Sequence, residues 1–131
     1  MVVYVFGNFD EERDRAALTA AEKLKKEFPE VAFIEIAPNA DLPFADTEKV
    51  IIVDVIGGIR GIRVIDDPDK IILPPRGTAH DFDLGFQLKY LKKLGKLKRV
   101  TVIGLPATGK INYARLQSIF KKLVAQDMQG S

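Results

Sequence analysis

Several reactive residue types are scarce or missing in this chain of 131 residues. It contains no Cys and no Trp, a single His at position 80, and two Ser, at positions 118 and 131. Without Cys there is no thiolate nucleophile, iron–sulfur cluster, Cys-bound zinc or disulfide framework. Ser118 falls midway along a helical pattern and Ser131 ends the chain, so neither suits a Ser-His-Asp triad with His80. The sequence excludes thiol chemistry and argues against a serine hydrolase.

Long apolar runs are missing as well. The first six residues carry no basic segment ahead of an apolar one, and no stretch approaches the roughly 18 apolar residues that a membrane span needs. We therefore expect a soluble, cytoplasmic protein without a membrane span. A length of 131 residues with 47% hydrophobic content is enough for one packed core, so residues 1–131 are expected to form a single domain.

The two halves of the chain carry opposite charge. Residues 1–69 hold eight Lys and Arg against fifteen Asp and Glu, a balance of −7, whereas residues 70–131 hold twelve against three, a balance of +9. Lys89, Lys92 and Lys96 recur at helical spacing opposite an apolar stripe, which is typical of a solvated helix face. A nucleic-acid site is the less favoured interpretation, and no nucleic-acid partner is expected.

Apolar runs alternate with helical patterns along the chain. Strands are expected over residues 2–6, 31–36, 50–55, 59–65 and 100–105, and helices over about residues 12–28, 81–94 and 112–128. The 59–65 strand alternates Ile and Val with Arg and Gly, as a half-exposed edge strand does. It should be antiparallel, because too little chain separates it from the 50–55 strand for a crossover. The pattern predicts an α/β fold, a three-layer α/β/α sandwich on a mostly parallel sheet of about five strands with one antiparallel edge strand.

Three polar residues are expected near the carboxyl ends of these strands, where ligands of such sheets gather. Asp14 lies in the first turn of the first helix, Asp54 ends the apolar run 50–53, and His80 precedes a helix. A buried carboxylate such as Asp54 is costly without a cation or hydrogen-bond donors. Two carboxylates and one imidazole suit a borderline divalent metal such as nickel, zinc, iron or manganese. The structural alternatives are a helix cap for Asp14, loop amides for Asp54 and an ordinary surface position for His80.

A second motif competes with this site. Residues 104–110, Gly-Leu-Pro-Ala-Thr-Gly-Lys, match the phosphate-loop frame G-x-x-x-x-G-K. Ile111 stands where a magnesium-binding Ser or Thr is expected, Pro106 lacks an amide donor, and few residues follow the motif. An ordinary strand-to-helix turn is favoured over a nucleotide-binding protein, and no organic cofactor is expected.

The candidate residues, taken in order, resemble the nickel–iron hydrogenase maturation endopeptidases. That family opens with a strand, a Gly-Asn pair and an acidic residue six positions after the Asn, matched here by Gly7-Asn8 and Asp14. An apolar strand ending in Asp is matched by Asp54. A His before a helix with Gly-aliphatic-x-x-x-Leu is matched by His80 and by Gly85-Phe86 onward. The resemblance covers nearly the whole chain.

The resemblance implies a function. Members of the family trim the C-terminal tail of the hydrogenase large subunit after nickel insertion, so the implied partner is the large-subunit precursor. Asp14, Asp54 and His80 match the three metal-contacting positions, and the implied metal is nickel carried by the substrate. The adjacent peptide bond would then be cleaved with the help of metal polarisation or a bound water.

Other residues bear on the implied cleavage reaction, either as supporting groups or as departures from the family's pattern. Asn8, Asp81 and Asp83 are nearby groups that could orient His80 or the scissile bond, and the general base is not assigned. Residues 37–40, Ala-Pro-Asn-Ala, replace the family's usual Asp-Gly-Gly-Thr turn. A non-catalytic binding or assembly module of the same fold is therefore the second interpretation.

Overall fold

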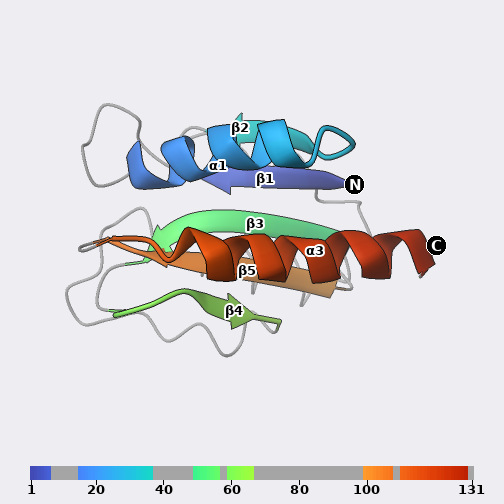
Figure 1. Ribbon diagram of the computed structural model, residues 1–131. Helices are drawn as coiled ribbons and strands as arrows, with labels where there is room; N and C mark the ends of the chain where they lie inside the picture. The colour runs from blue at the N-terminus through green and yellow to red at the C-terminus, as the bar shows by residue number, and fades with distance from the viewer. Residues whose placement is uncertain (7–14, 37–48, 57–58, 67–98, 108–109, 130–131) are drawn as a thin grey trace.

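The computed structural model describes residues 1–6, 15–36, 49–56, 59–66, 99–107 and 110–129. Its elements, in chain order, are β1 (Val2–Phe6), α1 (Arg15–Glu27), β2 (Ala32–Ile36), β3 (Lys49–Ile56), β4 (Arg63–Ile65), β5 (Arg99–Pro106) and α3 (Tyr113–Gln129) (Figure 1). Each coincides with a segment expected from the sequence. The predicted helix over about residues 81–94 lies outside the described residues.

The strands form one five-stranded sheet in the order β2-β1-β3-β5-β4. Neighbouring strands are parallel from β2 to β5, and β4 runs antiparallel to β5. The expected α/β fold with a mostly parallel sheet and one antiparallel edge strand is confirmed. β4 pairs with β5 and not with β3, because β1 and β5 already occupy the two sides of β3. It is also shorter than the alternating pattern predicted, since only residues 63–65 pair with β5.

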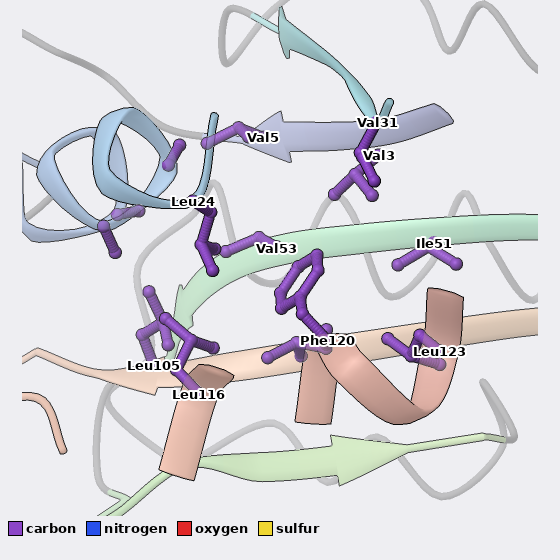
Figure 2. Close-up of a cluster of buried hydrophobic side chains, with 14 of the residues drawn as sticks. Val3, Val5, Leu24, Val31, Ile51, Val53, Leu105, Leu116, Phe120 and Leu123 are labelled. Carbon is purple, nitrogen blue, oxygen red and sulfur yellow. The ribbon is translucent and has the colours of Figure 1, made fainter. Parts of the chain in front are cut away.

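One face of the sheet, called here the helical face, is covered by α1 and α3 (Figure 1). Apolar residues spaced three or four apart on each helix are buried against the strands: Ala17, Ala20, Ala21 and Leu24 from α1, and Leu116, Phe120 and Leu123 from α3. The Phe120 ring centroid lies 6.1 Å from that of Phe28 and 5.9 Å from that of Phe33. Figure 2 shows Leu24 of α1 and Leu116, Phe120 and Leu123 of α3 converging with side chains of β1, β3 and β5. The helical face therefore holds the larger part of the described core.

The opposite face, called here the second face, carries a separate cluster of apolar side chains. Alternation along β3 directs Val50, Ile52 and Asp54 to this side, away from Ile51 and Val53. Its apolar cluster comprises Phe6, Ile36, Val50, Ile52, Val100 and Val102, all buried. Neither α1 nor α3 contributes a residue to this cluster. The sheet thus separates a core built with α1 and α3 from a face on which a carboxylate lies among apolar side chains.

The start of α3 is fixed by a side-chain cap. The Asn112 Oδ1 accepts the Arg115 backbone N–H at 3.1 Å, and the Asn112 carbonyl accepts the Leu116 N–H at 3.1 Å. The side-chain bond satisfies the Arg115 amide, which has no partner inside the helix, and this is why Asn is favoured at this position. Neither described helix is long and apolar enough to cross a membrane.

Polar contacts also join α1 to α3 at the solvent-accessible rim of the helical face. Glu27 Oε2 accepts hydrogen bonds from Gln117 Nε2 at 2.6 Å and, more weakly, from the Tyr113 hydroxyl at 3.5 Å. The Lys23 ammonium lies 5.3 Å from the centre of the Tyr113 ring. Burial, followed by the negative charge and the hydrogen bond of Glu27, raises the pKa of Tyr113 above 10.0.

Candidate functional site

The central residue of the candidate site is Asp54, near the carboxyl end of β3. Its side chain is 2% exposed, and it is the one buried charged or polar side chain among the described residues. The Asp54 Oδ1 accepts the backbone N–H of Val55 at 2.9 Å, which restrains the orientation of the carboxylate. Because a desolvated carboxylate costs several kcal/mol unless donors or a cation compensate it, a buried Asp at the end of a strand is a candidate ligand-binding residue.

The register of the sheet places two further residues beside Asp54. Asp54 pairs with Gly104 of β5, and Gly104 pairs in turn with Arg63 of β4. Residues directly opposite one another in neighbouring strands share a face, so Asp54, Gly104 and Arg63 form a row across the second face. With about 4.8 Å between strands, the backbones of Asp54 and Arg63 are roughly 10 Å apart.

Gly104 permits a close approach in this row. A Cβ atom at position 104 would lie 2.5 Å from Ile56 Cδ1, 3.2 Å from Ile56 Cγ1 and 3.4 Å from Ile59 Cδ1. The isoleucine side chains therefore occupy the space that any larger residue would need. They form an apolar strip between the carboxylate of Asp54 and the strand that carries Arg63.

The row lies at the edge of the sheet where β1, β3 and β5 all end, called here the carboxyl edge (Figure 1). α1 begins at Arg15 at this same edge, so the chain segment directly before α1 is attached there. Asp54, near the carboxyl end of β3, lies at this edge, as expected from the sequence.

The other predicted site residues are not among those the structure describes. Asp14, His80, Asn8, Asp81 and Asp83 all lie outside the described residues. Within the described ranges, no group of three or more His, Cys, Asp or Glu side chains is placed to hold a metal ion. The predicted ligand set of Asp14, Asp54 and His80 therefore stays a prediction.

The first three residues of the competing phosphate-loop motif belong to a strand. Gly104, Leu105 and Pro106 belong to β5 and pair with Asp54, Val55 and Ile56 of β3. A backbone held in a sheet ladder cannot curl around a phosphate group. α3 begins at Tyr113, so Lys110 precedes the helix instead of opening it. Gly104 is explained by the close packing of Ile56, and the motif is a strand-to-helix connection.

Sequence reasoning did not identify Arg63 as a neighbour of Asp54. The alternation of Ile and Val with Arg and Gly over residues 59–65 indicated an exposed edge strand, and Arg63 is indeed exposed. Its proximity to Asp54 depends on β4 pairing with β5, a long-range feature that the local pattern does not encode. No signal in the sequence singled out this arginine from the other exposed basic residues.

Comparison with known proteins gives matches to solved structures only. No family model matches the sequence, and no curated protein matches it. The hydrogenase maturating endopeptidase HybD from E. coli is 15% identical, with a TM-score of 0.65 over 98% of this chain and 93% of that one. The [NiFe] hydrogenase maturation protease HybD from Thermococcus kodakarensis is 20% identical, with a TM-score of 0.65 over 93% and 97%. The solution structure of an endopeptidase from Escherichia coli is 17% identical, with a TM-score of 0.62 over 99% and 94%.

The likeness lies in the arrangement of helices and strands, since few residues are identical. It extends over nearly the full length of both chains in each comparison. The fold implied by the sequence resemblance is therefore confirmed: this chain has the α/β fold of the hydrogenase maturation endopeptidases.

Proposed function

We propose that this protein is an endopeptidase that removes the C-terminal extension of a nickel–iron hydrogenase large-subunit precursor after nickel insertion. The observation that carries the proposal is the buried carboxylate of Asp54 at the carboxyl edge, in a fold shared with the HybD maturation proteases of E. coli and Thermococcus kodakarensis. The spacing of Gly7-Asn8, Asp14 and His80 supports it from the sequence.

In this proposal the nickel arrives on the substrate. Asp54 supplies one carboxylate ligand to nickel already bound by the precursor, and Asp14 and His80 supply the other two. The Val55 N–H restrains the Asp54 carboxylate before substrate binds, so less reorganisation is needed when the metal arrives. The positive charge of the metal then offsets the cost of burying the carboxylate.

A transient role fits the small number of ligands. Three side chains from separate segments are few for a tightly held resident metal, but they can complete the coordination of a metal that already has protein ligands. Binding would thereby depend on prior metal insertion. Asn8, Asp81 and Asp83 are assigned the supporting role of orienting His80 or the scissile bond.

The cleavage reaction can be tested with purified components. The precursor is incubated with the protein, with and without nickel loaded, and the large subunit is weighed by mass spectrometry. We expect loss of the extension only from the nickel-loaded precursor, and no cleavage by the Asp54→Ala or His80→Ala variants. Equal cleavage of nickel-free precursor, or normal cleavage by both variants, would contradict the metal-directed mechanism.

The second candidate is a non-catalytic assembly module, favoured by the Ala-Pro-Asn-Ala sequence at residues 37–40. The same experiment separates it from the protease. A stable complex with nickel-loaded precursor, isolated by size-exclusion chromatography without any loss of mass from the large subunit, would support the assembly module.

A further inference from the structure

Arg63 is placed to contact a ligand that also contacts Asp54. It lies on the same sheet face and in the same cross-strand row, separated from Asp54 by Gly104 alone. Its side chain is exposed and forms no ion pair with another described residue. A long cationic side chain in this position can reach over the second face at the carboxyl edge.

Two more arginines lie near the start of β4. Arg60 precedes Arg63 by three residues and is exposed. Arg115, from the first turn of α3, extends over the intervening segment, because a Cβ atom on Gly61 would lie 4.0 Å from its Nη1. Arg60, Arg63 and Arg115 are called here the arginine edge. The three positive charges belong to the surface around the start of β4, which favours the binding of an anion there.

The surface between the arginine edge and Asp54 is apolar. Ile56 and Ile59 are partly exposed and lie against Gly104, the residue of the row between Asp54 and Arg63. Along the row a buried acidic side chain is thus followed by aliphatic side chains and then by an exposed arginine. Such an order is complementary to a peptide that carries a metal cation at one point and a negative group further along the chain.

We propose that the arginine edge binds a carboxylate of the precursor's C-terminal extension while the substrate-borne nickel lies against Asp54. This inference rests on the proposed function and adds to it a specificity determinant outside the metal ligands. Arginine suits the role because its planar guanidinium forms paired hydrogen bonds with carboxylates. The separation of roughly 10 Å corresponds to about three residues of extended peptide.

The inference is tested by kinetics of precursor cleavage. Arg63→Gln is expected to raise KM about tenfold with kcat little changed, the signature of a lost binding contact distant from the reacting bond. Arg63→Glu is expected to raise KM further. Arg99→Gln is the matched control, because Arg99 is also exposed but lies at the opposite end of β5. An unchanged KM for Arg63→Gln, or an equal rise for Arg99→Gln, would overturn the inference.

The carboxylate can come from an acidic side chain or from the chain terminus, and two altered precursors distinguish these sources. In one, the Asp and Glu residues of the extension are changed to Asn and Gln. In the other, a Gly-Ser tail moves the terminal carboxylate away. The tenfold difference between wild type and Arg63→Gln should disappear with whichever precursor has lost the bound group. A full difference on both altered precursors would contradict carboxylate recognition.

The experiment keeps this inference separate from the proposed function. If the wild-type protein leaves nickel-loaded precursor uncut, the proposed protease activity is wrong. If it cleaves the precursor and Arg63→Gln cleaves it with the same KM, the protease activity stands and the role of the arginine edge is wrong. Thermal unfolding of each variant establishes that a change in KM does not come from a loss of folded protein.

Discussion

The two faces of the sheet differ in the side chains that they bury. The helical face is closed by α1 and α3, and its buried side chains are all apolar. The second face is apolar along most of its length, but at the carboxyl edge it carries the row of Asp54, Gly104 and Arg63. Both faces use the same strands, because successive side chains alternate between them.

This difference indicates that one face of the sheet stabilises the fold and the other binds a ligand. The helical face gains stability from burial and tight packing, and nothing in it requires a charge. On the second face a carboxylate is buried, which costs free energy, and it lies at the edge where parallel strands end and ligands bind. Substitutions on the helical face should therefore change stability, and substitutions of the two charged residues of the row, Asp54 and Arg63, should change substrate binding.

The largest expected effect is on the helical face. Phe120 is fully buried between α3 and the strands, next to the rings of Phe28 and Phe33. Phe120→Ala should lower the free energy of unfolding by about 3–5 kcal/mol, through lost burial and the cavity left behind. Urea-induced unfolding measures this change. Met128→Ala is the control on the same helix, because Met128 is 79% exposed and its loss should change stability by less than about 0.5 kcal/mol.

An intermediate effect is expected at the glycine of the row. Gly104→Ala places a Cβ against Ile56 Cδ1 and should destabilise the fold by about 1–3 kcal/mol. In an Ile56→Val background the clashing Cδ1 is absent, so the cost should fall. A double-mutant cycle by chemical denaturation measures the coupling. The same cost in both backgrounds would show that Gly104 is retained for a reason other than this contact.

The smallest effect is expected at the polar rim between α1 and α3. Burial, followed by the negative charge and hydrogen bond of Glu27, raises the pKa of Tyr113 in the folded state, so the neutral tyrosine contributes stability that is fully present below pH 10. That contribution is lost as the pH rises through the folded-state pKa. Tyr113→Phe should cost less than about 1 kcal/mol at neutral pH, since both side chains are solvent-accessible. Thermal unfolding between pH 8 and about 11 should show a smaller alkaline decline for the variant, and an identical decline would contradict the assignment.

The sequence predicts the helices and strands well because their signals are local. Apolar runs and helical spacing placed β1, β2, β3, β5, α1 and α3 to within a few residues of their observed bounds. The antiparallel direction of β4 also followed from its short link to β3. Its partner did not, because the order of strands in a sheet depends on contacts distant in sequence.

The site could be predicted only in part. Asp54 was expected to be buried because it follows an apolar run in a strand, and the structure confirms its burial. Arg63 was not identified, since its relation to Asp54 arises from two successive strand pairings. Asp14 and His80 were assigned from motif spacing, and spacing alone does not fix the distance between side chains from separate segments.

The central claim is that Asp54 binds metal carried by the substrate, and affinity tests it most directly. Isothermal titration measures the affinity of wild-type protein and Asp54→Asn for nickel-loaded and nickel-free precursor. The wild type should bind the nickel-loaded form at least tenfold more tightly, a difference of about 1.4 kcal/mol, and Asp54→Asn should lose this preference while remaining folded. Equal affinity of the wild type for both forms, or a preference unchanged in Asp54→Asn, would contradict the account.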